Sequence, residues 1–331
     1  MSEQRVIGDL GYPALRGLAL SRGDVDRTAA ARTRPALTEE LLADPGTQVL
    51  ALRRDRFPVG HTPDGLHLVF RAPDEADRGR LRIFLGRAPE ASGHDAEGAP
   101  TAYLGVVEDG EPGEGWANLR AAGLRLGDRD AGLVTTLLAL ANWHATHGHC
   151  PRCGASTEPV AAGWVRRCPE DRSEHFPRTD PSVIMSVVDE AGRLLLGRGL
   201  TWPEDQFSVL AGFVEPGESL EAAVAREVLE ESGVRVEEVR YLGSQPWPFP
   251  SSLMLGFTAA AVTTELQHDP EELAEVRWVT REEYAALLAS GGIRVPGGIS
   301  IARRLIEAWL GQSVEAAAGR PVVEGWRPAK S

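Results

Sequence analysis

The chain has 331 residues, with 48 acidic side chains against 35 Lys and Arg, so its formal net charge is −13. A composition of 42% hydrophobic and 25% charged residues is typical of globular proteins and excludes fibrous and disordered classes. The acidic balance excludes general electrostatic attraction to nucleic acid, which would need a local basic patch or bound metal.

No apolar run reaches the roughly 20 residues that a membrane-spanning helix needs. The first residues show no basic segment followed by an apolar one, as a secretory signal would. We therefore expect a soluble, cytoplasmic protein with no membrane partner. The length predicts two domains, with room for a small third module.

Residues 1–145 are expected to form an N-terminal α+β domain. Apolar and β-branched runs predict strands at 48–53, 66–71, 81–85 and 102–107. The Pro-Asp-Gly turn at 63–65 predicts that the first two strands form a hairpin. Gly, Pro and acidic residues predict loops at 90–100 and 108–115. Apolar residues at helical spacing predict a helix over 130–145.

Residues 146–178 form a Cys- and His-rich module, residues 179–312 alternate strands with helices, and residues 313–331 are expected to be a surface tail. Predicted strands are 183–189, 193–198, 207–213, 239–243, 254–260 and 276–279. Predicted helices are 220–232, 281–290 and 301–310, the second beginning with a capping box of Thr280 and Glu283. This alternation is typical of an α/β domain.

The three cysteines of the chain, Cys150, Cys153 and Cys168, lie within 19 residues. An odd count so confined does not fit the disulfide framework of a secreted protein. Cys150 and Cys153 have the spacing of a zinc knuckle, and Cys168 follows after fourteen residues. The pattern predicts a structural zinc site, for which four nitrogen or sulfur ligands are usual.

A helix rich in glutamate follows a strand that ends near Phe213. Ser219 is a suitable N-cap, and Gly233 is a suitable end. Glu227, Glu230 and Glu231 stand at i, i+3 and i+4 and therefore share one face. Leu220, Val224 and Val228 form the opposite, apolar face, which we expect to pack on a sheet.

Three neighbouring carboxylates repel each other unless a cation lies among them, and Mg²⁺ prefers such oxygen ligands. The alternative is a solvated acidic face, which a bare Glu-Val-Leu-Glu-Glu would favour. The wider pattern, Gly212, five residues, Glu218, seven residues, Arg226-Glu227, then Glu230-Glu231 and Gly233, resembles the signature of the Nudix hydrolases at every position.

The Nudix resemblance implies an α/β/α sandwich with a mixed sheet. It implies that Glu227 and Glu231 ligate Mg²⁺ or Mn²⁺, that Glu230 assists, and that Arg226 orients a carboxylate. Ala211 would offer its backbone carbonyl to a metal. Glu231 is our first candidate for the base that takes a proton from water. Glu275, before a predicted strand, is a second candidate as base or metal ligand, with a plain surface acid as the alternative.

The segment 244–252 reads SQPWPFPSS, and its alternating prolines stiffen an extended chain. It displays two aromatic rings suited to stacking on nucleobases; a purely structural loop or a proline-rich peptide ligand are the alternatives. Beside a Nudix box, this segment resembles the NADH pyrophosphatase family, which includes NAD-capped RNA hydrolases. The resemblance implies these substrate-binding residues: Gln245, Pro246, Trp247, Pro248, Phe249, Pro250, Ser251, Ser252, Phe176, Ala302 and Arg120.

The same resemblance implies a zinc-ribbon module at 146–178 and a Nudix-like fold for the N-terminal domain. The family has a second C-x-x-C, but here the sequence reads Cys168-Pro-Glu-Asp171. Asp171 holds the aligned position of the fourth zinc ligand. His175 is chemically the more usual ligand, and His149 is a third option. A ribbon that has lost its metal is the alternative.

The family resemblance implies hydrolysis of NAD(H) to NMN(H) and AMP, removal of NAD from RNA 5′ ends, and a homodimer. One alternative is a Nudix hydrolase of another substrate, such as ADP-ribose or a dinucleoside polyphosphate. Another is a Nudix-fold protein that binds nucleotide or RNA without turnover, although such proteins often have eroded boxes and this one is intact.

Overall fold

The computed structural model describes residues 14–63, 65–89 and 100–322, and they group into two compact units. The N-terminal unit comprises Leu20–Thr179 together with Pro246–Ser252. The C-terminal unit comprises Asp180–Gln245 and the chain from Leu253, together with the residues up to Ala19. No helix in the described ranges is long and apolar enough to cross a membrane.

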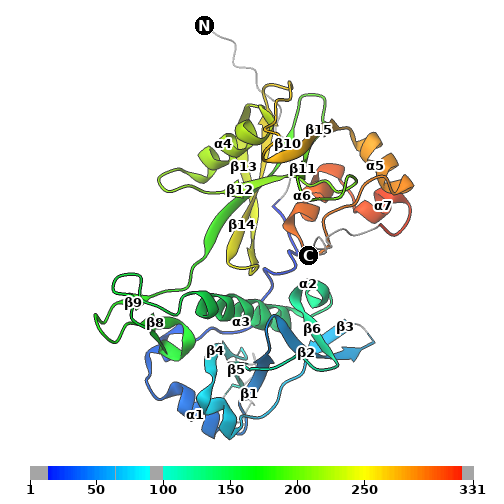
Figure 1. Ribbon diagram of the computed structural model, residues 1–331. Coiled ribbons are helices and arrows are strands. Elements are labelled where there is room, and N and C mark those ends of the chain that lie inside the picture. Colours follow the sequence, from blue (N-terminus) through cyan, green and yellow to red (C-terminus); the bar gives the residue numbers. More distant parts are fainter. Residues whose placement is uncertain (1–13, 64, 90–99, 323–331) are drawn as a thin grey trace. The chain divides into compact units, whose positions relative to one another are not determined.

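The N-terminal unit contains three small three-stranded sheets and one long helix (Figure 1). Its helices are α1 (Leu37–Ala43), α2 (Leu119–Ala122) and α3 (Asp128–Thr146). Its strands are β1 (Gln48–Leu52), β2 (Arg56–Thr62), β3 (Gly65–Leu68), β4 (Leu81–Arg87), β5 (Ala102–Val107), β6 (Trp116–Asn118), β7 (Glu158–Val160), β8 (Val165–Arg167) and β9 (Glu174–His175). The sheet orders are β1-β5-β4, β3-β2-β6 and β7-β8-β9.

The predicted helix over 130–145 is confirmed as α3, but the predicted hairpin has the wrong partner. β3 pairs antiparallel with β2, and β1 pairs parallel with β5. β2 was missed because Pro58 lies inside it, and proline is confined to strand edges and ends. Asp64 and most of the predicted 90–100 loop lie outside the described residues.

The C-terminal unit is built on a six-stranded sheet of order β13-β14-β10-β11-β15, with β12 paired to β10. Its strands are β10 (Asp180–Val188), β11 (Leu194–Gly199), β12 (Leu210–Phe213), β13 (Val236–Trp247), β14 (Ser252–Ala261) and β15 (Leu273–Val279). Its helices are α4 (Leu220–Ser232), α5 (Arg281–Ser290), α6 (Ile301–Leu310) and α7 (Val314–Ala318). The bounds of α4, α5 and α6 match the predicted helices.

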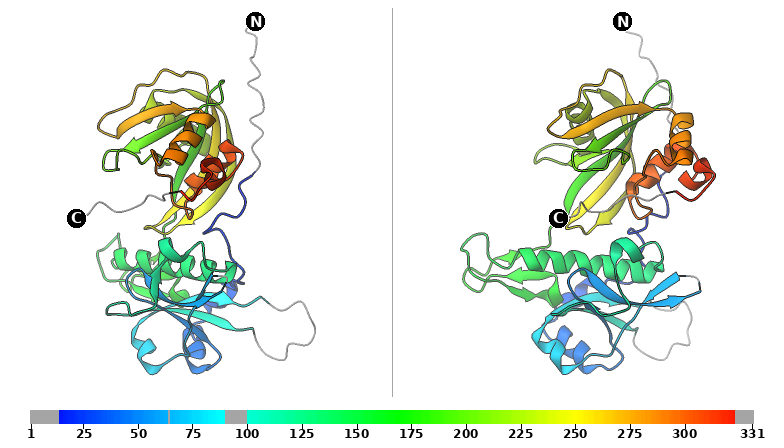
Figure 2. Two further views of the ribbon diagram at one scale, coloured as in Figure 1. Left: turned by 90° about the vertical axis from the view of Figure 1, so that its right-hand side faces the viewer. Right: turned by 45° about the vertical axis from the view of Figure 1, so that its right-hand side comes forward.

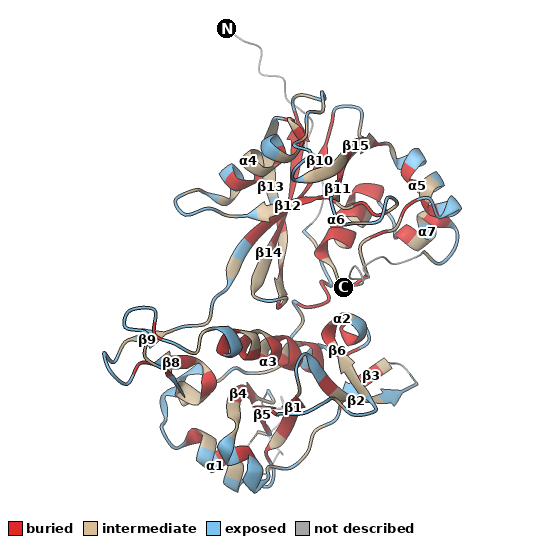
Figure 3. Cartoon of the chain, viewed as in Figure 1, coloured by how far each residue is buried: buried red, intermediate tan, exposed pale blue. Residues whose placement is uncertain are grey.

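The two faces of this sheet carry separate cores, with α4 on one side and α5, α6 and α7 on the other (Figure 2). Along β10, Val183, Met185 and Val187 pack with α4, whereas Ile184 and Val188 pack with the opposite core. This alternation follows from the two-residue period of a strand. Residues 182–188 of β10 are all buried, because both faces of the sheet are covered (Figure 3). The expected α/β/α sandwich is confirmed.

The residues from 313 onward do not begin a surface tail. Val314 and Ala318 of α7 are buried in the core shared with α5 and α6. The helix is only five residues long, so its apolar period gives little signal. Residues 323–331 lie outside the described residues.

The capping box that begins α5 gives a direct test of the fold. The Thr280 side chain accepts a hydrogen bond from the Glu283 amide, and the Glu283 carboxylate accepts one from the Thr280 amide. Thr280→Ala should lower the free energy of unfolding by about 1 kcal/mol, because the Glu283 amide at the start of the helix loses its hydrogen-bond acceptor. Urea unfolding should show a lower midpoint, and Thr201→Ala, at an exposed loop position, should not.

Candidate active site and metal centre

The glutamate face of α4 is fixed by the backbone at both ends of the helix. The Ser219 hydroxyl accepts a hydrogen bond from the Ala222 amide at 3.2 Å. Gly233 ends the helix with a φ of 73°. Val224 and Val228 are fully buried against the sheet, so the carboxylates point away from that core.

Arg226 forms ion pairs with three carboxylates of the acidic cluster. Its guanidinium donates at 2.9 Å to both Glu227 Oε1 and Glu230 Oε2, and at 2.6 Å to Glu218 Oε1. It also donates to the Phe213 carbonyl at 2.9 Å. One cation therefore links the end of β12, the loop before α4 and two carboxylates of the helix.

Glu231 lies outside this network. Its Oε2 is buried and has no hydrogen-bond partner among the described residues. Burial, followed by the negative charges of Glu227, Glu272 and Glu230, raises the pKa of Glu231 to about 8. Burial also raises the pKa of Glu227, against the opposing effect of Arg226.

β12 presses closely on the carboxylate cluster. A methyl group at Gly212 would lie 1.9 Å from Glu227 Cδ, so only glycine allows this carboxylate to rest on the strand. Ala211, the predicted carbonyl ligand, precedes Gly212 in β12 and pairs with Ile184 of β10. Two features of this cluster fit a hard divalent cation. Glu231 has a buried carboxylate oxygen without a hydrogen-bond partner, and Gly212 leaves just enough space for the Glu227 carboxylate.

The predicted Glu275 lies on β15 opposite Arg198 of β11, to which it is joined by an ion pair of 3.6 Å. Glu272, which the sequence reasoning passed over, is the residue whose charge raises the pKa of both Glu227 and Glu231. The two acids are three residues apart at the start of β15. Only the fold shows that Glu272 acts on the carboxylate cluster and that Glu275 is paired with Arg198.

The predicted substrate segment makes contacts within each of the two units. Gln245 is fully buried in the C-terminal unit, where its amide donates to the Ile299 carbonyl at 2.9 Å. In the N-terminal unit, the Trp247 and Phe249 rings meet edge to face at 5.0 Å. Arg120 lies 3.8 Å from the Phe249 ring centre, and Asn142 donates to the Pro248 carbonyl at 3.0 Å.

Arg120 is therefore brought together with the predicted aromatic pair, although it is more than 120 positions away in the chain. Phe176, just after β9, is 65% exposed and so is available for stacking. Ala302 is buried in the core at the start of α6, and its amide donates to the Ser300 hydroxyl. Its methyl group packs in that core.

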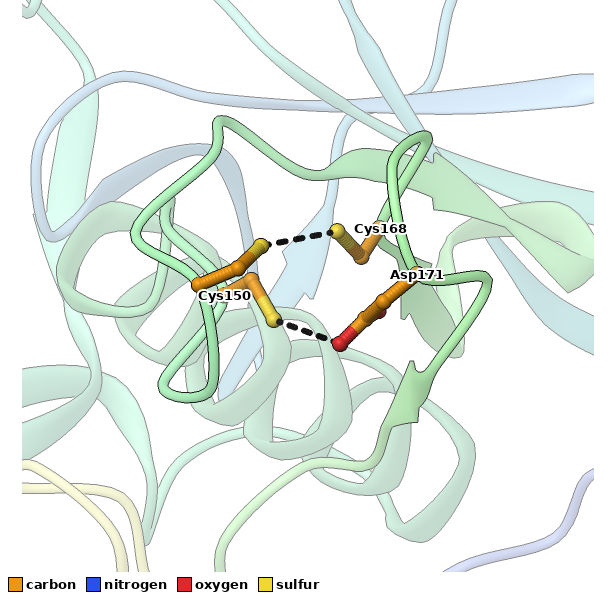
Figure 4. Close-up of side chains that lie close together, drawn as sticks. Cys150, Cys168 and Asp171 are labelled. Atoms are coloured by element: carbon orange, nitrogen blue, oxygen red, sulfur yellow. Dashed lines mark hydrogen bonds between the residues drawn. The ribbon is translucent and has the colours of Figure 1, made fainter.

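The cysteine module gathers a second set of donors. One atom from each of Cys150, Cys153, Cys168 and Asp171 lies within 4.8 Å of the others. Cys150 Sγ lies 3.7 Å from Asp171 Oδ2, and the sulfurs of Cys153 and Cys168 are 3.5 Å apart (Figure 4). Three thiols and a carboxylate suit a structural zinc ion.

Ser173 holds Asp171 in this position. Its amide and hydroxyl donate to Asp171 Oδ1 at 2.9 and 2.5 Å, which leaves Oδ2 toward Cys150. His175 lies outside the set of four, with its Nε2 3.0 Å from the Ser173 hydroxyl. His149 is exposed. The geometry favours Asp171 over both histidines as the fourth ligand.

The raised pKa of Glu231 predicts a stability that depends on pH. Between its ordinary value of 4.5 and about 8, the folded chain binds the proton more tightly than the unfolded chain, so stability falls as pH rises through this window. Without added divalent metal, Glu231→Gln should raise the melting temperature, by more at pH 8 than at pH 5.5. Glu221→Gln, on an exposed position of α4, is the control, and equal gains at both pH values would contradict the assignment.

Zinc binding should follow the geometry of the module. Asp171→Ala should lower zinc affinity by at least tenfold, because one of four ligands is lost. Asp171→Cys should keep one zinc per chain, measured by mass spectrometry of the metal after dialysis. Loss of zinc from His175→Ala, but not from Asp171→Ala, would place the fourth ligand at the histidine.

Two protein families match this chain. Residues 178–295 match the NUDIX domain, and residues 145–176 match the NADH pyrophosphatase zinc ribbon domain. A solved NUDIX hydrolase from Nitrosomonas europaea is 22% identical, with a TM-score of 0.38 over 50% of this chain and 94% of that chain.

Two named relatives also match the chain, and the first of them covers most of it. The NAD-capped RNA hydrolase NudC of Mycobacterium bovis BCG Pasteur is 40% identical over 304 residues, covering 88% of this chain and 94% of that protein. The human NAD-capped RNA hydrolase NUDT12 is 42% identical over 199 residues, covering 56% of this chain and 43% of that protein. With an intact glutamate box, a zinc ribbon and this coverage, the chain belongs to the Nudix hydrolases, in the NADH pyrophosphatase family.

Proposed function

We propose that this enzyme hydrolyses the diphosphate of NAD(H) to NMN(H) and AMP, and removes NAD from the 5′ ends of capped RNA. The observation that carries the proposal is Glu231, a half-buried residue with a buried, unpartnered carboxylate oxygen on the helix that bears the Nudix box. The relatives in Mycobacterium bovis and human, both named NAD-capped RNA hydrolases, support the choice of substrate.

Mg²⁺ or Mn²⁺ would be held by Glu227 and Glu231, with the Ala211 carbonyl and either Glu272 or Glu275. Such an ion neutralises phosphate oxygens and lowers the pKa of water. We favour Glu272 over Glu275, because the charge of Glu272 acts on both helix carboxylates, whereas Glu275 is paired with Arg198.

The residues of the chain divide the work of hydrolysis. Arg226 holds Glu227 and Glu230 in place through its two hydrogen bonds. Glu231 accepts the proton of the attacking water, while the new bond from the water oxygen to phosphorus replaces the bridging bond of the diphosphate. The leaving phosphate keeps the electrons of the broken bond.

The aromatic segment would bind the nucleotide. Arg120 and Asn142 fix Trp247 and Phe249 before any ligand arrives, so stacking costs little conformational entropy. Phe176 offers a further exposed ring. Ser251 and Ser252 remain proposed polar contacts of the same segment, whereas Gln245 is fully buried and would hold the segment in place through its hydrogen bond to the Ile299 carbonyl. We also propose that the enzyme is a homodimer and acts in the cytoplasm.

The direct test compares kcat/KM for NADH, NAD⁺, ADP-ribose and NAD-capped RNA with Mg²⁺ or Mn²⁺. We expect AMP and NMNH from NADH, and expect Glu231→Gln to lower kcat by about 10²–10⁴-fold, the usual contribution of a positioned base. Glu221→Gln on the same helix should keep wild-type activity.

Three outcomes would change the proposal. A preference for substrates of the ADP-ribose type over NAD(H) and capped RNA would leave the assignment as a hydrolase unchanged and would replace the proposed substrate. Tight nucleotide binding with no cleavage under any divalent metal would indicate a binding protein. Full activity of Glu231→Gln would remove Glu231 from the reaction.

A further inference from the structure

A cavity of about 550 Å³ in the N-terminal unit has an unusual charge for such an acidic chain. It lies between the segment before α1 and the cysteine module. Its charged lining is five arginines and one carboxylate: Arg32, Arg34, Arg80, Arg82, Arg167 and Glu174. Its volume is in the range of small-molecule sites.

Four of these arginines have carboxylate partners. The pairs are Arg34 with Glu40, Arg82 with Glu39 at 2.7 Å, Arg80 with Asp77 at 3.2 Å, and Arg167 with Glu174 at 2.6 Å. Arg32 forms no ion pair with any described carboxylate. Its Nε is buried without a hydrogen-bond partner in the described part of the chain, and one terminal nitrogen donates to the Arg27 carbonyl at 3.2 Å.

The Arg32 guanidinium is held in place by an aromatic ring. Its central carbon lies 3.5 Å from the centre of the Trp164 ring, which is fixed by a 2.7 Å hydrogen bond from its Nε1 to the Phe84 carbonyl. Arg27 lies 5.9 Å from the same ring. Burial and the charge of Arg27 lower the pKa of Arg32, so the cation lacks the anion that would stabilise it.

The wall beside Arg32 is strained and rigid. Ala161 and Ala162 have φ values of 48° and 51°, a backbone conformation that is unfavourable for residues with a side chain. At Gly163, φ is 85° and a methyl group would meet the Arg82 carbonyl at 2.5 Å. His144 donates from Nε2 to the Gly163 carbonyl at 2.8 Å. Such strain persists where the surrounding structure holds it, often at ligand sites.

We propose that this cavity binds a phosphoryl group, from a free nucleotide or a nucleic-acid chain, through the guanidinium of Arg32. Arginine presents planar N–H donors that match phosphate oxygens, and stacking on an aromatic ring does not use those donors. The exposed Phe176 lines the same cavity. For the nucleic-acid ligand, the proposal rests on the proposed function, since capped RNA brings phosphodiesters to an acidic enzyme.

The test measures binding with probes that this enzyme does not cleave. A 5′-monophosphate RNA decamer with a 3′ fluorophore is titrated by anisotropy, and AMP and inorganic phosphate are titrated by calorimetry. Arg32→Gln should weaken binding of the occupant about tenfold, the loss of one charge-assisted contact. For RNA, the slope of log K against log salt should fall by about one. Arg54→Gln is the matched control, because Arg54 is exposed and lines no part of this cavity.

Weakened binding of RNA alone would assign the site to the nucleic-acid chain, and weakened binding of AMP or phosphate would assign it to a free ligand. Unchanged affinities for all three probes in Arg32→Gln would overturn the proposal. Hydrogen exchange of the wild-type chain gives an independent reading if the variant misfolds: ligand should protect residues 29–38 and 159–167, and absence of protection would also overturn it. Parallel NADH hydrolysis by the wild type separates failure of this site from failure of the proposed function.

Discussion

The crowding of carboxylates on one face of α4 is the constraint on which the rest of the C-terminal unit depends. Glu227, Glu230 and Glu231 share this face, and a single guanidinium, Arg226, compensates the first two. Glu231 is left buried with an unpartnered oxygen and a raised pKa. Such an arrangement costs stability in the isolated chain and becomes favourable when a cation supplies the missing charge. This acidic cluster therefore lowers the stability of the metal-free fold, which is the reason for proposing a metal site here.

The cluster is positioned by backbone geometry more than by flexible side chains. The Ser219 cap and the left-handed Gly233 fix where α4 begins and ends, and Val224 and Val228 fix its rotation on the sheet. Gly212 then admits the Glu227 carboxylate to the surface of β12. Because rigid elements carry the carboxylates, little reorganisation is needed when ligands bind.

The sequence predicted the features that depend on neighbouring residues in the chain. The bounds of α4 and α5 follow from caps and glycine stops that lie within a few residues of each helix, and the cysteine spacing located the second metal centre. Long-range pairing was not accessible: β1 joins β5 across more than 50 residues, and Pro58 concealed β2. The choice between Glu272 and Glu275 also depends on the fold, because both acids precede or begin the same strand and only one faces Arg198 across the sheet.

Unbalanced buried charge has opposite signs in the two units, and each sign identifies a ligand. In the C-terminal unit, Glu231 has too little positive charge around it, which points to a divalent cation. In the N-terminal unit, Arg32 has no carboxylate partner and a second arginine beside it, which points to an anion. The other four arginines along that cavity are paired with neighbouring acids, so the exception is informative. A chain with a net charge of −13 repels polyanions at long range, and fixed, desolvated arginines are the means by which it can still hold a phosphate at short range.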